Sequence, residues 1–282
     1  MKKTWHCGRY ELSFERPLLM GIVNITPDSF SDGNQYLHTD AAIAHAKQLI
    51  ADGADILDIG AESTRPGAQP VSLEEELHRL LPVVEELRAL DVPISVDTFK
   101  SEVMRAVLNA GADIINDIAG FRSSASIEAV ADSNCGLCVM HMQGEPRTMQ
   151  QQPHYDDLYA EVRGFLAQQA QKLRTAGVAA ERIMLDPGLG FGKSLVDNYR
   201  LLRDLHQLQV DSYPWLIGLS RKSMIGAVLD RPPKQRLAGS LAGMLAAVAR
   251  GAAVLRVHDV AESADALNVW LAVEQGINNE RT

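Results

Sequence analysis

The sequence predicts an α/β fold, a single (β/α)8 barrel, and three observations support that prediction. Short, almost continuously apolar runs alternate with longer amphipathic segments along the 282 residues. Strands of this kind belong to parallel sheets that helices cover on both faces. About eight such units occur, and a barrel of eight units needs roughly 250 residues. Since no linker or change of composition divides residues 1–282, we expect one domain, with an open doubly wound sheet as the alternative.

The elements follow one another in a regular order. The expected strands, rich in Val, Ile and Leu, are residues 18–25, 54–61, 93–98, 113–120, 137–142, 183–190, 214–220 and 253–259. The expected helices lie near residues 40–52, 74–90, 101–110, 126–132, 156–176, 196–209, 237–250 and 261–276. Residues 1–17 form an N-terminal extension, in which residues 4–16 are expected to make a hairpin that closes the barrel bottom, and residues 279–282 are expected to be a frayed tail.

Composition excludes several classes of protein. A net charge of -9 argues against a general nucleic-acid surface. The three cysteines suggest no disulfide framework and suit a reducing cytosol, and the CxxC spacing of Cys135 and Cys138 lacks the second pair that a zinc site would need. Neither a signal peptide nor an apolar run of membrane-spanning length is visible. We therefore expect a cytoplasmic protein that binds neither nucleic acid nor membrane.

Polar residues occur where nearly every apolar run ends. They are Asn24, Glu62, Thr64, Arg65, Asp97, Asn116, Asp117, His141, Asp186, Arg221, Lys222, Arg256 and His258. In a barrel the carboxyl ends of all strands meet at one face, where the active sites of such barrels lie. The sequence therefore predicts an active site on the C-terminal face.

The first two loops carry candidate ligands for an anion. Asn24 opens a long loop, residues 23–33, that suggests a lid, and its carbonyl oxygen suits Mg²⁺ beside substrate phosphate oxygens. Arg65 lies between Thr64 and a Pro-Gly turn, a stiff mounting for a bidentate phosphate contact. A plain surface turn remains the alternative at Arg65, and a structural role the alternative at Asn24.

The middle of the chain offers groups that recognise a planar heterocycle. Asp97, Asn116 and Asp186 end three expected strands, and their oxygens and amide meet ring N–H groups in plane. Asp186 alternatively caps the turn at Pro187 and Gly188. The glycine-rich run 188–194 is not a P-loop, because Pro187 stands where the motif needs glycine. We interpret this run as a flexible loop that lets the chain pass close to a ligand.

The last two strands predict an anion site. Arg256 and His258 are two residues apart and therefore share one face of a strand. Phosphate in barrels commonly binds between the loops after strands seven and eight, which here carry Ser220, Arg221 and Lys222 on one side and Arg256 to Asp259 on the other. The expected ligand is a phosphorylated or diphosphorylated small molecule.

Eight stretches taken in order resemble the dihydropteroate synthase family of folate biosynthesis. They are NITPDSFSDG, ESTRPGA, SVDT, IINDI, MHMQGEPRTMQ, LDPGLGFGK, SRKSMIG and RVHD, and the resemblance runs from about Met20 to Val260. Ala61 and Asn34 stand where glycines are frequent in the family, and Phe99 follows SVDT. None of these departures removes a residue that matches a functional position.

The resemblance implies a transferase that joins p-aminobenzoate to 6-hydroxymethyl-7,8-dihydropterin diphosphate. It implies that Asp97, Asn116, Asp186 and Lys222 hold the pterin and that Thr64, Arg65, Arg256 and His258 contact the pterin diphosphate. It places p-aminobenzoate near Pro66, Phe191 and Ser223, and Mg²⁺ at Asn24. Asp97, Lys222 and Arg256 are the expected catalytic residues, and a homodimer is the expected assembly.

Two alternatives remain beside this expectation. A pterin-binding methyltransferase that acts with a corrinoid partner would share the Asp and Asn set, but it would not need Arg65, Arg256 and His258 as a diphosphate clamp. A non-catalytic pterin-binding barrel would show gaps in the set of strand-end residues. Within the seventh loop, Arg221 either helps to bind phosphate or braces the loop.

Overall fold

Eight parallel strands close into a barrel in the computed structural model, which describes residues 4–25, 35–63, 69–146 and 148–276. The barrel runs in the order β10-β3-β4-β5-β6-β7-β8-β9. Its strands are β3 (Leu18–Asn24), β4 (Ile56–Gly60), β5 (Ile94–Asp97), β6 (Ile114–Asp117), β7 (Gly136–Met140), β8 (Ile183–Asp186), β9 (Trp215–Gly218) and β10 (Ala252–Val257). Each overlaps one expected run, so the predicted barrel is confirmed and the open sheet is wrong.

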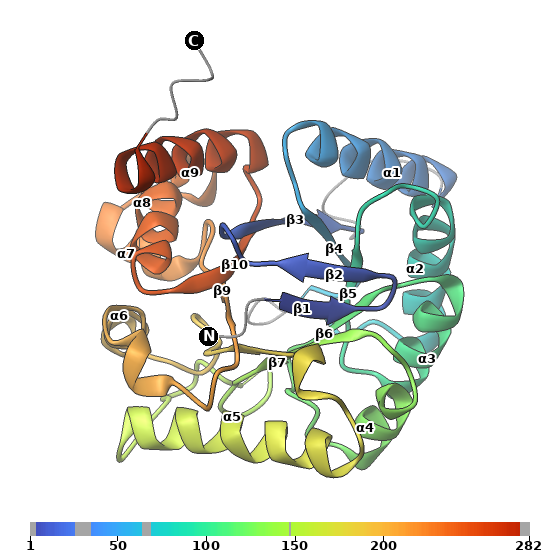
Figure 1. Ribbon diagram of the computed structural model, residues 1–282, viewed down its shortest axis with the longest axis horizontal. Coiled ribbons are helices and arrows are strands. Elements are labelled where there is room, and N and C mark those ends of the chain that lie inside the picture. The colour runs from blue at the N-terminus through green and yellow to red at the C-terminus, as the bar shows by residue number, and fades with distance from the viewer. Residues whose placement is uncertain (1–3, 26–34, 64–68, 147, 277–282) are drawn as a thin grey trace.

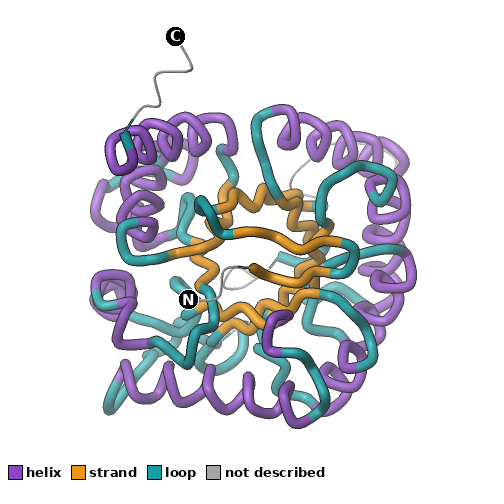
Figure 2. Tube along the Cα trace, viewed as in Figure 1, coloured by secondary structure: helices purple, strands orange, loops and turns teal. Residues whose placement is uncertain are grey.

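Helices surround the barrel as an outer ring (Figures 1 and 2). They are α1 (Gln35–Ala51), α2 (Leu73–Leu87), α3 (Ser101–Ala110), α4 (Ser124–Ala131), α5 (Leu158–Thr175), α6 (Leu195–Arg203), α7 (Ser223–Leu229), α8 (Leu237–Val248) and α9 (Val260–Gln275). Short 3-10 helices are η2 (Ala180–Arg182), η3 (Leu205–Leu208) and η4 (Pro233–Gln235). The expected helix at 196–209 is split into α6 and η3, and α7 was not predicted, because its seven residues continue directly from a polar strand end.

The helices bury one face each against the outer surface of the barrel. In α2, Ser72 accepts a hydrogen bond from the backbone N–H of Glu75, and the buried side chains of Leu80, Val84 and Leu87 follow at helical spacing. The barrel strands contribute their outward-pointing residues to the same core. None of the described helices is both long enough and apolar enough to cross a membrane.

The predicted N-terminal hairpin is present and closes the bottom of the barrel. Strands β1 (Thr4–Cys7) and β2 (Tyr10–Ser13) pair antiparallel and lie across the barrel opening (Figure 1). Trp5 is fully buried, and its indole N–H donates to the carbonyl of Arg182, just before β8, at 2.8 Å. The hairpin packs on the lowest inward-pointing side chains of the barrel, which are Leu18, Met20, Ile56, Ile114, Cys138, Met184, Leu216 and Val254.

In four of these strands, the side chain two positions further along faces the barrel interior one layer higher. Polar groups begin there, since Asp58 follows Ile56, Asn116 follows Ile114, Asp186 follows Met184 and Arg256 follows Val254. All four are buried or half-buried. The barrel is thus plugged by apolar side chains below and is charged above.

Candidate active site

Arg256 lies between two carboxylates in the upper half of the barrel. Its Nε donates to Asp58 Oδ2 at 2.6 Å, and a terminal nitrogen donates to Asp97 Oδ2 at 2.9 Å. Asp58 is fully buried and also accepts the hydroxyl of Ser95 at 2.6 Å. The inward orientation predicted for Arg256 is confirmed.

Asp58 is a site residue that the sequence interpretation missed. That interpretation took polar residues only from strand ends, whereas Asp58 stands in the middle of the run 54–61. The available signal was a carboxylate inside a buried strand, since such a group needs a partner. The same carboxylate accepts a hydrogen bond from the Asn116 amide at 3.3 Å. Asp58 therefore contacts two residues that were predicted to bind the substrate, Asn116 and Arg256.

Burial and charge oppose each other in this cluster. Burial, opposed by Arg256 and supported by Asp58, raises the pKa of Asp97 to about 7. Burial also opposes the charge of Arg256, but Asp58 and Asp97 outweigh it and raise the pKa of the guanidinium. The cluster therefore holds a permanent cation beside a carboxylate that titrates near neutral pH.

Asp186 occupies the opposite part of the same layer. Its Oδ1 accepts the backbone N–H of Gly188 at 2.6 Å, which confirms the turn-capping interpretation. Burial raises the pKa of Asp186, and the neighbouring Lys222 lowers it. The capping bond uses Oδ1 of Asp186, and the contact of Asp186 with a pterin stays a prediction.

Lys222 connects the loops after β8 and β9. Its Nζ donates to the carbonyl of Leu189 at 2.5 Å and lies 4.7 Å from the ring centre of Phe191, within cation–π range. Burial lowers the pKa of Lys222 to about 8, with Asp186 opposing this effect. Ser223 follows as the exposed first residue of α7. Lys222 and Phe191 are thus in contact, and Ser223 is the next residue along the chain.

Arg221 braces its loop. It has a φ of 58°, and its backbone N–H donates to Ser240 Oγ at 2.9 Å. Its Nε donates to Asp259 Oδ2 at 3.0 Å, and a second guanidinium nitrogen pairs with the other carboxylate oxygen. Of the two roles that the sequence left open, this geometry supports bracing. The same two loops meet again where His258 Nδ1 lies 3.0 Å from Ser220 Oγ.

The loop after β8 requires glycine because it passes against its own chain. A Cβ on Gly188 (φ 67°) would overlap the carbonyl oxygen of His141, and one on Gly190 (φ 86°) would lie 3.1 Å from Lys222 Cδ. These glycines therefore let the loop pack against the protein itself, and the predicted close approach to a ligand stays a prediction.

Substituting Gly188 with alanine is expected to destabilise the protein strongly. The left-handed backbone and the overlap with His141 together predict a loss of at least about 2–3 kcal/mol in the free energy of unfolding. Gly164→Ala is the control, because its Cβ meets nothing within 4 Å on helix α5 and alanine favours a helix by about 0.5–1 kcal/mol. Urea unfolding checks both, and equal stabilities for the two variants would contradict this interpretation of the loop.

The remaining predicted residues belong to the first two loops. Thr64, Arg65 and Pro66 lie outside the described residues. Asn24 ends β3, where it is half-buried and in register with Gly60 of β4. Within the described ranges, no three His, Cys, Asp or Glu side chains form a group that would hold a metal ion by themselves. One amide oxygen fits Mg²⁺ that takes its other ligands from water and substrate phosphate.

Taken together, the closed barrel and the charged layer at its C-terminal mouth are typical of a barrel enzyme whose active site lies at that mouth. The family model of pterin binding enzymes matches residues 20–258. Relatives named dihydropteroate synthase include that of Haemophilus influenzae, 49% identical over 93% of this chain and 95% of its own length, and that of Escherichia coli, 48% identical over 96% of both chains.

Solved structures agree. The Burkholderia cenocepacia dihydropteroate synthase complexed with 7,8-dihydropteroate has a TM-score of 0.89 and 57% identity, covering 96% of both chains. The Xanthomonas albilineans dihydropteroate synthase with 4-aminobenzoic acid has a TM-score of 0.92 and 49% identity, covering 99% of this chain and 100% of that chain. The chain belongs to the pterin-binding dihydropteroate synthase family of transferases.

Proposed function

We propose that this protein condenses p-aminobenzoate with 6-hydroxymethyl-7,8-dihydropterin diphosphate, giving 7,8-dihydropteroate and diphosphate. The observation that supports this most directly is the position of Arg256 between Asp58 and Asp97 at the barrel mouth. Carboxylates there suit the N–H edges of a pterin, and a guanidinium beside them suits its diphosphate. The relatives with bound 7,8-dihydropteroate and 4-aminobenzoic acid support the same substrates.

The pterin is assigned to the charged layer. Asp97, Asn116 and Asp186 accept or donate along its ring edge, and Lys222 approaches from the loop after β9. Thr64, Arg65 and His258 join Arg256 in binding the diphosphate. Mg²⁺, held by Asn24 together with phosphate oxygens and water, would neutralise part of the diphosphate charge.

The reaction is a substitution at the CH₂ carbon attached to the pterin ring. The C–O bond to diphosphate breaks, and its electron pair leaves with diphosphate, so positive charge spreads into the ring. Asp97 stabilises that charge, and Arg256 stabilises the departing anion. The amine of p-aminobenzoate then forms the C–N bond and releases a proton. Phe191, Pro66 and Ser223 are assigned to docking this second substrate.

The decisive test supplies both substrates with Mg²⁺ and measures diphosphate release. Release only when both substrates are present supports the synthase. Pterin binding without release would favour the non-catalytic barrel, and methyl transfer to a corrinoid would favour the methyltransferase. Arg256 favours the synthase over the methyltransferase, because a diphosphate clamp is useful only to the synthase.

The pH dependence of kcat/KM is expected to follow Asp97. Because its pKa is raised to about 7 and the ionised carboxylate stabilises the pterin cation, kcat/KM for the pterin diphosphate should rise from pH 5.5 with an apparent midpoint near pH 7, and it should fall again above about pH 8, where Lys222 loses its proton. Steady-state rates across this range check it, with Asp97→Asn as the comparison, since the diphosphate also titrates. If the rise of kcat/KM with pH is unchanged in Asp97→Asn, the group that titrates is not Asp97.

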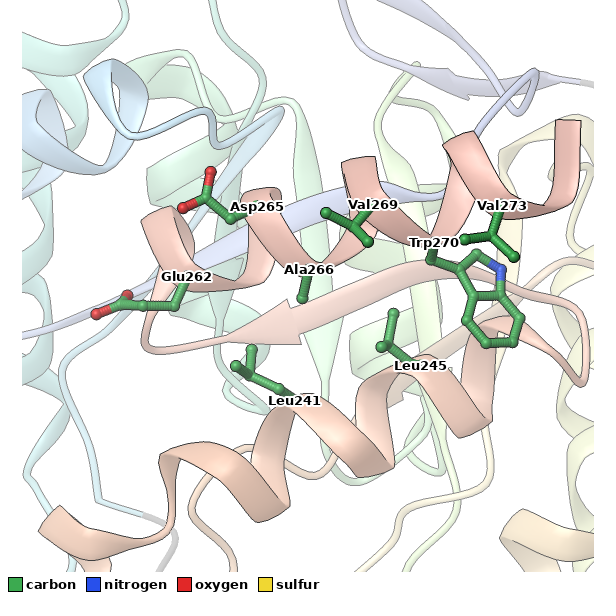
Figure 3. A pocket seen from close by; sticks show the side chains of 8 residues that line it. All are labelled: Leu241, Leu245, Glu262, Asp265, Ala266, Val269, Trp270 and Val273. Atoms are coloured by element: carbon green, nitrogen blue, oxygen red, sulfur yellow. The ribbon is translucent and has the colours of Figure 1, made fainter. Parts of the chain in front are cut away.

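We propose further that the protein is a homodimer that works in the cytoplasm, and an exposed apolar groove supports the dimer. Helices α8 and α9 line it with Leu241, Leu245, Ala266, Val269, Trp270 and Val273 (Figure 3). Val269 and Val273 are 66% and 76% exposed. Exposed apolar side chains that gather in one patch indicate a surface that another protein chain covers. Sedimentation equilibrium tests this proposal. Val269→Asp should yield monomer, and Gln168→Asp on the surface of α5 should stay dimeric.

A further inference from the structure

Lys193 has an unusual position for a lysine that belongs to no predicted substrate set. It stands at the end of the loop after β8, and only 2% of the residue is exposed. Its Nζ donates to the carbonyls of Gly188 at 3.0 Å and Phe191 at 2.9 Å. It also lies 2.9 Å from His141 Nδ1 and 3.4 Å from the His141 carbonyl, on the chain after β7. One ammonium group thus joins two neighbouring loops.

The hydrogen bonds of Lys193 do not depend on its charge, because a neutral amine keeps two N–H donors. Burial, and then the charge of Lys193, lower the pKa of His141 well below its usual value, so His141 Nδ1 is available as an acceptor. Burial lowers the pKa of Lys193 to about 7, with Asp186 opposing. An apolar side chain would fill the same space without the cost of burying an amine, so packing alone does not explain a lysine here.

The loop that Lys193 holds carries groups assigned to both substrates. The carbonyl of Leu189 accepts Lys222 Nζ, and the ring of Phe191 lies beneath that ammonium group. The N–H of Gly188 meets Asp186. A second attachment comes from Asn198 of α6, whose Oδ1 accepts the N–H of Gly190 at 2.6 Å. The loop is therefore held from both sides, and Lys193 is the attachment closest to Phe191.

We propose that Lys193 is a positioning residue for the p-aminobenzoate site, acting by fixing the Phe191 carbonyl, and hence the Phe191 ring, against the chain after β7. Lys193 itself contacts no reacting atom. The proposal deepens the proposed function and rests on it where it assigns Phe191 to the second substrate. A residue with a purely structural role would, when replaced, lower stability without distinguishing the two substrates.

Lys193→Met tests the proposal, because methionine keeps most of the volume and removes the donors. Losing hydrogen bonds from a charged donor predicts a rise of about 10- to 100-fold in KM for p-aminobenzoate. The KM for the pterin diphosphate and kcat should change by less than about threefold, since the hydrogen bonds of Lys193 go to His141, Gly188 and Phe191 and to no side chain assigned to the pterin. Lys193→Gln, which keeps an N–H donor, should restore part of the KM, and Lys172→Met, an exposed lysine of α5, should match the native protein.

Amide hydrogen exchange in the free protein provides the second readout. Lys193→Met should speed exchange at Gly190 and Phe191 while leaving strand β6 protected. An unchanged KM for p-aminobenzoate, an equal rise in both KM values, or unchanged exchange would each overturn the proposal. If Lys193→Met does not fold, Lys193→Gln takes its place in both measurements. Failure of the native protein to join the two substrates would refute the proposed function, and the exchange result would still decide whether Lys193 holds the loop.

Discussion

Replacing Arg256 with methionine is expected to lower kcat/KM for the pterin diphosphate by about 10²–10³-fold, the usual effect of removing one preorganised group that stabilises developing charge. Methionine keeps the stem of the side chain and removes the cation. The substitution also leaves Asp58 and Asp97 side by side without the guanidinium that both contact, so the pKa of Asp97 should rise above about 7. Steady-state kinetics and the pH profile of the variant measure both effects.

Two comparison variants make the Arg256 result specific. Arg256→Lys retains the positive charge but cannot form bidentate hydrogen bonds, so it should recover only part of the lost kcat/KM. Arg163→Met removes an exposed arginine from α5 and should leave turnover unchanged. Full turnover with unaltered inhibition by diphosphate in Arg256→Met would show that another group binds the leaving anion.

Asp97→Asn is expected to lower kcat by about 10²–10³-fold and to change KM much less, because the carboxylate acts on charge that appears only in the transition state. Asparagine keeps the shape and can still hydrogen-bond the pterin edge. Asp58 continues to partner Arg256, so the variant should fold. Single-turnover measurements with both substrates separate the chemical step from substrate binding.

The control for Asp97 is Asp132→Asn, which removes an exposed carboxylate at the end of α4. It should leave both kcat and KM at native values. A pure rise in KM for Asp97→Asn, with kcat retained, would reduce Asp97 to a binding group and transfer cation stabilisation to Asp58.

Particular residues show how far sequence reasoning reached. The hairpin was expected from the position of residues 4–16 before the first barrel strand, and polar strand ends correctly located Asp97, Asn116, Asp186 and Arg256 at one end of the barrel. Asp58 was missed because it lies inside a strand, and α7 because its residues follow a polar strand end without a periodic pattern of their own. The bracing role of Arg221 depends on Asp259, which is 38 positions away in the sequence. A local sequence pattern cannot predict a contact between residues so far apart.

The sequence by itself determined the barrel, the end of the barrel that carries the site, and the family. These features rest on local periodicity and on residue types at strand ends, which are properties of short segments. Only the tertiary structure decided which polar groups meet. Arg256 contacts Asp58 across 198 positions, and Lys193 contacts His141 across 52, because closing the sheet brings β10 beside β3 and packs the loop after β8 against the one after β7. Barrel closure brings these residues together, and the cost of burying an unpaired charge favours their pairing. Both effects arise only when the chain is folded.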